Sequence, residues 1–274
     1  MSSGRSDAPG ISTRTGAGAG GGTLVRLWDV IVVLVTRDYK GRYKNTVIGL
    51  GWSLISPLMY LAVFYTVFRI AFAISVPFYA TYVFIGVLAW MWVQSALNDS
   101  VGSITSRPNL IMQPGFPVAA LPIAAIATNL ITFAAATPVL ILIALIEGAG
   151  LHVSILLMPL IAAVQFLLML GFAYIVAALN VVFRDTQYIL PVVLQLGYYI
   201  SPIFYDPASI PAEYRSLLQL NPLYHIIAGY RAVVIDGVAP QFLPLAIVAA
   251  ASIVLLVIAH RYFMRASANF LEEI

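Results

Sequence analysis

The chain has 274 residues, of which 61% are hydrophobic and only 9% are charged, whereas an ordinary soluble domain has about 25% charged residues. This composition excludes a soluble globular protein. The chain contains no cysteine, which excludes disulfide scaffolds, thiolate metal sites and cysteine nucleophiles. The formal net charge of +3 does not indicate nucleic-acid binding, because the basic residues flank apolar runs and form no soluble basic domain.

The N-terminal region divides into a polar tail and an amphipathic segment. Residues 1–23 are rich in Gly, Ser, Thr and Ala, which predicts a disordered cytoplasmic tail. Residues 24–35 carry apolar side chains at helical spacing, interrupted by Arg26 and Asp29, and are too few to cross a bilayer. A basic cluster follows them. The pattern predicts an amphipathic helix at the membrane surface, with a peripheral helix that merely anchors the chain as the alternative.

Six apolar runs are long enough to cross a bilayer, which needs about 20 residues. They cover residues 47–68, 79–97, 118–146, 154–179, 188–204 and 242–260. The fifth run is the shortest and most polar. The sequence therefore predicts an all-α membrane protein in which residues 24–274 form one domain with six transmembrane helices.

The distribution of basic residues predicts the orientation of these helices. Eleven of the 14 Lys and Arg residues lie in the N-terminal segment, the second-to-third and fourth-to-fifth connections and the C-terminus. Because cytoplasmic loops are enriched in Lys and Arg, both termini are predicted to be cytoplasmic. That orientation requires an even number of spans.

The longest external connection, residues 205–241, is rich in proline and mixed in polarity. Its apolar positions predict two short helices broken at Asn221-Pro222, since proline disfavours a helical conformation of the preceding residue. Irregular backbone at membrane depth is tolerated only against protein or a water-filled cavity. The segment therefore predicts external re-entrant helices at a cavity mouth, and a plain surface loop is the alternative.

Two predicted spans carry stripes of aromatic and neutral polar residues at helical spacing. The stripes consist of Trp52, Ser56, Tyr60, Phe64 and Phe68 on the first span, and of Tyr188, Gln195 and Tyr199 on the fifth. Stacking tolerates changes of register, so such faces suit a sugar polymer that slides through a channel, by analogy with bases stacking on aromatic side chains. The alternative is that these residues form interfacial belts or pack helices.

The sequence lacks the residue patterns of several catalytic and ligand-binding sites. The sequence has no G-x-x-x-x-G-K-[ST] phosphate loop, so it predicts no ATP site of that type in this chain. The three histidines lie far apart, which predicts no metal site. The carboxylates avoid the predicted membrane midplane and form no paired constellation, which argues against a membrane-embedded transferase and an ion-coupled carrier.

Several short motifs occur in a specific order between about residue 24 and the C-terminus. They are Arg37-Asp38-Tyr39-Lys40 with Arg42-Tyr43-Lys44, Thr46, Gly49, Trp52 and Pro57, then Phe183-Arg184-Asp185, Ser201-Pro202-Ile203-Phe204-Tyr205 and Leu220-Asn221-Pro222-Leu223. This ordered set resembles the membrane subunit of polysaccharide ABC exporters, which include O-antigen, capsule and teichoic-acid exporters.

The resemblance implies a transport subunit and not an enzyme. It implies a homodimer of six-span permeases in the bacterial cytoplasmic membrane, bound to two cytoplasmic ATPase subunits that carry ATP and Mg²⁺, with no cofactor on this chain. A channel between the two copies would pass an undecaprenyl-linked glycan. A related ABC permease for a drug or lipid, and an ion-coupled secondary transporter, remain as alternatives.

The resemblance also implies roles for individual residues. The helix near residues 24–35 would be the family's interface helix. The cytoplasmic entrance would include Arg37, Tyr39, Lys40, Arg42 and Lys44; the contacts with the ATPase would include Arg107, Asn109, Arg184 and Asp185; and the external gate would include Asn221, Pro222, Tyr224 and Arg231. Residues 107–117 are less charged than the family pattern, and Arg184 with Asp185 has a second interpretation as a local ion pair at a helix end.

Overall fold

The computed structural model describes residues 21–43, 51–71 and 76–273. Within these ranges every regular element is a helix, as the composition predicts. The helices are α1 (Gly21–Tyr43), α2 (Gly51–Phe64), the π-helix η1 (Tyr65–Ala71), α3 (Tyr79–Val101), α4 (Pro108–Ile111), α5 (Ala120–Glu147), η2 (Val153–Leu157), α6 (Met158–Val182), α7 (Thr186–Ile200), η3 (Pro207–Ser209), α8 (Ala212–Gln219), α9 (Pro222–Val234), α10 (Phe242–Ala266), η4 (Ser267–Asn269) and α11 (Phe270–Glu273).

Among the described residues, five helical segments are long and apolar enough to cross a membrane. They are Leu54–Ala71, Tyr79–Val101, Ala120–Glu147, Val153–Val182 and Phe242–Asn269. These segments match five of the six predicted runs. The remaining run corresponds to α7, whose 15 residues extend about 22 Å, less than the hydrocarbon thickness of about 30 Å. The prediction of six spans is therefore confirmed for five helices, and the sixth stays a prediction.

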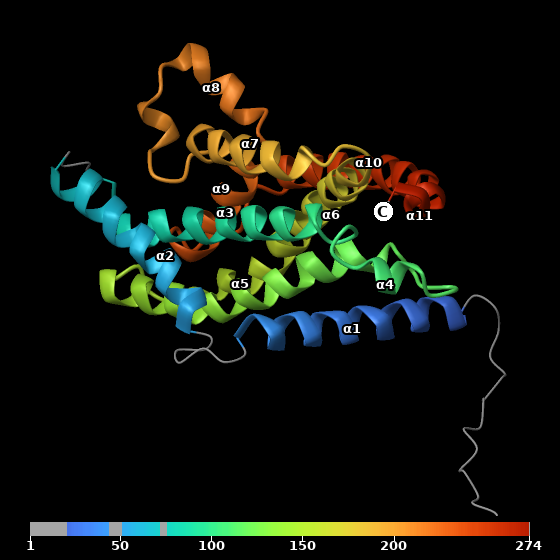
Figure 1. The fold of residues 1–274 in the computed structure, drawn as a ribbon. Helices are drawn as coiled ribbons and strands as arrows, with labels where there is room; N and C mark the ends of the chain where they lie inside the picture. Colours follow the sequence, from blue (N-terminus) through green and yellow to red (C-terminus); the bar gives the residue numbers. More distant parts are fainter. Residues whose placement is uncertain (1–20, 44–50, 72–75, 274) are drawn as a thin grey trace, which may run out of the picture.

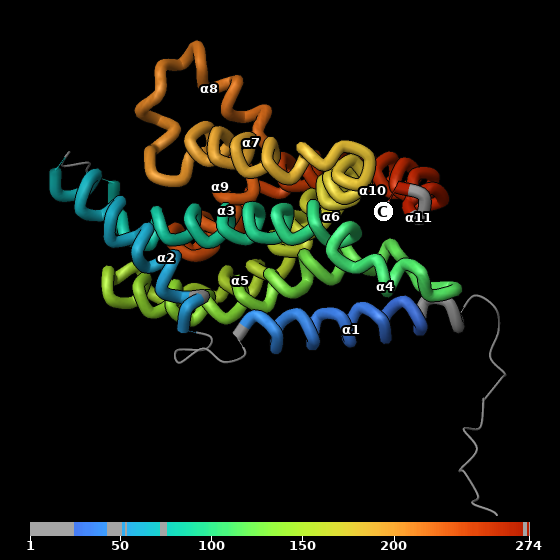
Figure 2. Tube along the Cα trace, viewed as in Figure 1, coloured from blue at the N-terminus to red at the C-terminus, as the bar shows by residue number. Residues whose placement is uncertain are grey.

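Helix α3 is the centre of the bundle and the most buried of the five segments. It packs against α5 and α6, and α10 packs along α6 on the other side (Figure 1). The tube in Figure 2 shows the same order, with α7 next to α3 and α6. The buried Gln165 side chain of α6 donates a hydrogen bond of 2.8 Å to the carbonyl of Ala89 in α3, which fixes the two helices in one register.

A carboxylate from α5 caps the first turn of α3. The Glu147 carboxylate accepts hydrogen bonds from the amides of Ala80 and Thr81, at 3.0 and 2.7 Å, and from the Thr81 hydroxyl at 2.7 Å. The N-cap residue Phe78 supplies no side-chain acceptor, so Glu147 takes over that function. A negative charge at a helix N-terminus is favourable. The contact ties one end of α5 to one end of α3.

Helix α1 is longer than the predicted segment 24–35 and runs along α5, close to α4 (Figure 1). Its buried positions Ile31 and Leu34, with the half-buried Leu27 and Val30, form one apolar stripe. Residues 21–23, expected in the tail, belong to α1, and residues 1–20 lie outside the described part. Helix α1 follows the direction of α5, and its position at the membrane surface stays a prediction.

The connection of residues 205–241 contains two short helices, α8 and α9, which meet at Asn221-Pro222 as predicted. The Asn221 side chain accepts a hydrogen bond from the amide of Leu223 and so caps α9, and Pro222 occupies the first helical position. The Asn221 side-chain nitrogen also donates to the Ser201 hydroxyl at 2.9 Å. Helix α9 is buried against α3 and α6, whereas α8 is exposed. The action of this pair as a gate stays a prediction.

Candidate functional site

The stripe on α2 meets the end of α7 in a cluster of aromatic rings. The ring of Phe64 stacks on that of Phe204 with centroids 5.2 Å apart and planes 5° apart, and Phe68 stacks on Phe204 at 5.2 Å. Tyr60 lies 6.4 Å from Phe64 and 6.5 Å from Tyr198. We call these five residues the aromatic cluster. Offset and tilted pairs at such distances are favourable arrangements of aromatic rings.

The predicted lumen residues divide into two groups. Tyr60, Phe64 and Phe68 enter the aromatic cluster, and Tyr199 borders it at 6.3 Å from Phe204. The other predicted residues are exposed on α2 and α7 outside the cluster, and these are Trp52, Ser56, Tyr188 and Gln195. The structure thus brings together half of the predicted set.

Sequence reasoning missed Tyr198 and Phe204, which connect the two stripes. Tyr198 is only 7% exposed and contacts both α2 and Trp90 of α3. Tyr198 forms a buried stripe with Leu190 and Leu194 at four-residue spacing. The sequence contains this spacing, but the prediction assigned the adjacent Tyr199 to the lumen instead. Phe204 lies beyond α7, where no helical period applies.

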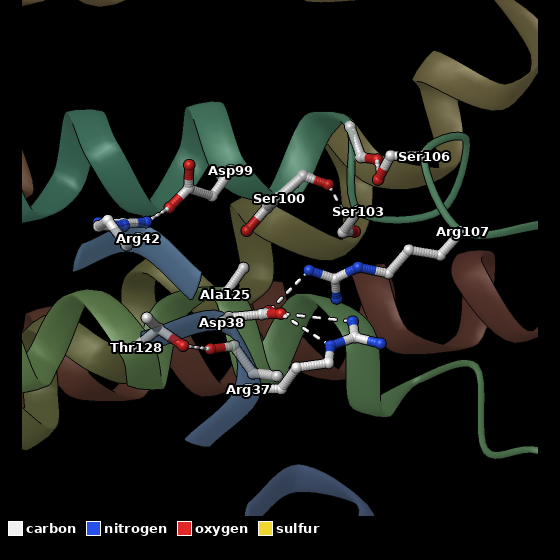
Figure 3. Close-up of polar contacts among 12 residues, drawn as sticks. Arg37, Asp38, Arg42, Asp99, Ser100, Ser103, Ser106, Arg107, Ala125 and Thr128 are labelled. Carbon is white, nitrogen blue, oxygen red and sulfur yellow. Dashed lines mark hydrogen bonds and ion pairs between the residues drawn. The ribbon is translucent and has the colours of Figure 1, made fainter. Parts of the chain in front are cut away.

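Two ion-pair networks connect the C-terminal half of α1 to α3 and to the N-cap residue of α4 (Figure 3). The Asp38 carboxylate accepts from Arg107 at 2.6 Å and from Arg37 at 3.3 Å. The Arg42 guanidinium donates to Asp99 at 2.5 Å and to the Asn129 side chain at 3.0 Å. Asn129 in turn donates to Asp99 at 2.7 Å.

These networks border a polar cavity of about 520 Å³ between α1, α3, the turn after α3, and α5. Of the predicted entrance residues, Arg37 and Arg42 line this cavity. Lys40 is exposed and Tyr39 is half-buried, both on α1, and Lys44 lies outside the described residues. The resemblance also implies that the basic stretch from Arg37 to Lys44 is a loop, whereas its described part, through Tyr43, belongs to α1.

The predicted ATPase-contact residues lie on two connections at the same end of the bundle as the C-terminus (Figure 1). Asn109 is exposed on α4, and Arg184 and Asp185 are exposed in the turn between α6 and α7. Arg107 differs from them because its guanidinium points inward to Asp38. Its position suits an internal connection between α1 and α4 better than a contact with another protein.

At the opposite end of the bundle, Arg231 of α9 is buried against the first turn of α3 and the segment after α7. It donates to the carbonyl of Ile203 at 2.9 Å and to that of Tyr82 at 3.3 Å, and its guanidinium carbon lies 3.3 Å from the centre of the Tyr82 ring. Burial lowers the pKa of Arg231 to about 10, so the side chain is protonated at neutral pH. Of the other predicted gate residues, Tyr224 is half-buried on α9.

A cavity of about 700 Å³ lies between α5 and α6. Its walls are apolar apart from Thr137, and they include Phe133 and Phe166. It offers no charged group that would orient a polar ligand. The ion pairs of Asp38 and Asp99 lie instead around the polar cavity beside α1.

The model of the ABC-2 type transporter family matches residues 29–235, from within α1 to the end of α9. The chain belongs to this family. The match confirms the resemblance at the level of the family. As an ABC-2 permease with five described helices that are long and apolar enough to cross a membrane, it is a multi-pass membrane protein.

Curated relatives of this ABC-2 permease carry more specific names. The O-antigen export system permease protein RfbA of Myxococcus xanthus is 30% identical over 247 residues, which cover 89% of this chain and 95% of that protein. A protein of the same name from Klebsiella pneumoniae is 29% identical, over 77% of this chain and 82% of its own length. The polysialic acid transport protein KpsM of Escherichia coli is 26% identical, over 76% of this chain and 81% of its own length.

Proposed function

We propose that this ABC-2 permease is the transmembrane subunit of an ATP-driven exporter of lipid-linked polysaccharide. The observation that carries the proposal is the aromatic cluster on α2, η1, α7 and the segment after α7. Rings that stack without charge bind successive units of a polymer in any register. The relatives named as O-antigen and polysialic acid transport proteins support a glycan as the substrate.

In the proposed assembly, two copies of the chain form a channel between them in the bacterial cytoplasmic membrane. Helix α7 completes six spans per copy, and both termini lie in the cytoplasm. The exposed apolar side chains of α2 and α7, such as Val63 and Val193 at 55% exposure each, support this arrangement. In one copy alone these helices have few partners in the bundle.

Two cytoplasmic ATPase subunits would bind ATP and Mg²⁺, and this chain would bind neither. The exposed residues Asn109, Arg184 and Asp185 would contact them. ATP binding would favour one arrangement of the ATPase pair, and the permease would follow as a shift between closed and conducting states. The undecaprenyl-linked glycan would enter from the membrane, with its sugars passing the aromatic cluster while α8 and α9 open at the external side.

Transport of a lipid-linked glycan in proteoliposomes tests this proposal directly. The liposomes contain the chain with its co-expressed ATPase, and the comparison is between the wild type, Tyr60→Ala and Tyr262→Ala. Tyr60 belongs to the aromatic cluster, whereas Tyr262 is an equally exposed tyrosine on α10. One aromatic contact contributes about 1 kcal/mol, so Tyr60→Ala should lower flux about fivefold without stopping ATP hydrolysis, and Tyr262→Ala should lower neither.

Each of the other outcomes identifies a competing function. Flux of a drug or lipid without flux of glycan would favour an ABC permease of another substrate class. Transport driven by a proton gradient without an ATPase would favour an ion-coupled carrier. Equal flux in Tyr60→Ala and the wild type would leave the aromatic cluster without a role in translocation.

A further inference from the structure

A second polar cavity, of about 320 Å³, opens at the external end of the bundle. It lies between α9, the N-terminal turn of α3 and the segment that follows α7. Arg231 forms its buried floor, the half-buried Tyr82 and Tyr224 stand at its sides, and the exposed Asp206 and Asp236 lie at its mouth. Ligand pockets begin at about 300 Å³, so the volume suits one small ring and not a length of polymer.

The floor of the cavity holds a fixed donor. The hydrogen bonds of Arg231 to the carbonyls of Tyr82 and Ile203 use its Nε and Nη2 atoms. These bonds and the ring of Tyr82 hold the guanidinium plane in place. Nη1 takes part in none of these bonds, and arginine carries five N–H donors. A fixed donor at the floor of a cavity, with donors to spare, is suited to bind hydroxyl oxygens.

The mouth of the cavity provides acceptors and a ring. The Asp206 carboxylate accepts only the local bond from the Ala208 amide among the hydrogen bonds of the described residues, and in the same part of the chain Asp236 forms no ion pair. The rest of the wall is apolar and includes Pro202 and Pro207. A pyranose presents hydroxyl groups and C–H surface in alternation. The carboxylates and the guanidinium can form hydrogen bonds with its hydroxyl groups, and the tyrosine ring and the apolar wall can contact its C–H surface.

The cavity and the aromatic cluster share the segment that follows α7. Phe204 of this segment stacks on Phe64 of α2 and on Phe68 of η1. Pro202 and Asp206 of the same segment line the cavity. A sugar bound there would lie beside the external end of the proposed lumen. Arg231 also holds the carbonyl of Ile203 in this segment, so occupancy of the cavity and the position of the segment are mechanically connected.

We propose that this cavity is an exit-side subsite that binds one neutral pyranose unit of the emerging glycan. The inference rests on the proposed export of a polysaccharide and deepens it. The formal charges of the side chains, one guanidinium and two carboxylates, sum to −1 and disfavour a uronic or sialic acid. The subsite therefore selects for uncharged sugars, in contrast to the acidic polymer in the name of the KpsM relatives.

Equilibrium binding of monosaccharide probes tests the subsite independently of transport. The full chain, with its co-purified ATPase, is placed in lipid nanodiscs, and saturation-transfer NMR measures binding of methyl mannopyranoside, methyl glucopyranoside and the acidic methyl glucopyranosiduronate. The variant is the double change Asp206→Asn with Asp236→Asn, because both side chains are exposed and an asparagine still caps the turn after residue 206. The control is Glu213→Gln, an exposed carboxylate on α8 outside the cavity.

We expect saturable binding of the neutral glycosides to the wild type and at least tenfold weaker binding of the uronate. The double variant should weaken neutral binding about tenfold, since a hydrogen bond to a charged group contributes about 1.5 kcal/mol or more, and should reduce the discrimination against the uronate. Glu213→Gln should bind as the wild type. Absence of saturable neutral binding, tighter binding of the uronate, or an unchanged double variant would each overturn the subsite.

The two proposals fail in different measurements. Glycan flux without neutral-sugar binding would reject the subsite and keep the exporter. Sugar binding that depends on Asp206 and Asp236, in a chain that moves no glycan, would keep the subsite and reject polysaccharide export.

Discussion

Gly86 shows how one missing side chain positions the segment after α7, which carries Phe204 of the aromatic cluster and also lines the cavity that contains Arg231. A methyl group at Gly86 would lie 2.9 Å from the Cα atom of Ile203 and 3.1 Å from its carbonyl oxygen. That oxygen accepts the hydrogen bond from Arg231. Backbone atoms cannot rotate away as a flexible side chain can, so α3 approaches the segment after α7 only because residue 86 has no Cβ.

Gly86→Ala should therefore destabilise the protein through this contact. Overpacking of a tight contact costs about 1 to 3 kcal/mol, which predicts a fall of about 5 °C in the unfolding midpoint of the detergent-purified protein. Gly102→Ala is the matched control, because nothing lies within 4 Å of a Cβ at that position and its backbone is right-handed. An equal effect of both changes would contradict the close approach at Gly86.

Helix α1 illustrates a connection between elements that are distant in sequence. Asp38 of α1 and Arg107, the N-cap residue of α4, are 19% and 23% exposed as side chains. Pairs shielded to this degree contribute more than exposed ones, which are worth about 0 to 1 kcal/mol. Because α4 carries the exposed Asn109, a movement imposed on α4 by an ATPase would reach α1 through this ion pair.

Asp38→Asn or Arg107→Gln should loosen α1 without unfolding the bundle. Loss of about 1 kcal/mol of local stability predicts amide hydrogen exchange in α1 that is several-fold faster, with α10 unchanged. Arg37→Gln serves as the control, because its side chain is 51% exposed and lies farther from Asp38, at 3.3 Å. Comparable acceleration by the control would mean that the net charge of α1, and not the pair with Arg107, holds the helix.

At the scale of the whole molecule, the bundle has a well-packed and a poorly covered side. Helix α3 packs against α5 and α6, and α6 packs against α10. By contrast, α2 lies obliquely across one end of α3 (Figure 1), and α7 buries only three of its residues. The exposed residues of α7 are mainly apolar and aromatic. A second copy on this side would cover both helices and enclose a lumen beside the aromatic cluster.

Cross-linking tests the side on which two copies meet, and the absence of native cysteine makes single-cysteine variants clean probes. Val63→Cys on α2 and Val193→Cys on α7 should give a cross-linked dimer in membranes. Ile258→Cys, which is 61% exposed on α10, should not. The reverse pattern would place the dimer contact on α10 and would remove the lumen from the α2 and α7 side.

The sequence by itself determined the features that depend on a segment's own composition. Runs of apolar residues placed five membrane-spanning helices, the proline at residue 222 placed the break between α8 and α9, and the ordered motifs indicated the transporter family. It also indicated the aromatic stripe of α2. These properties are local, because the length and period of one helix are encoded in consecutive residues.

Only the tertiary structure decided which faces meet. It joined Tyr60 and Phe64 to Tyr198 and Phe204, and it turned Arg107 toward Asp38 across 69 positions of sequence. It also buried Arg231 against a carbonyl 149 positions away. Such contacts depend on how several helices pack at once, and neither the hydropathy nor the period of one segment specifies its partner.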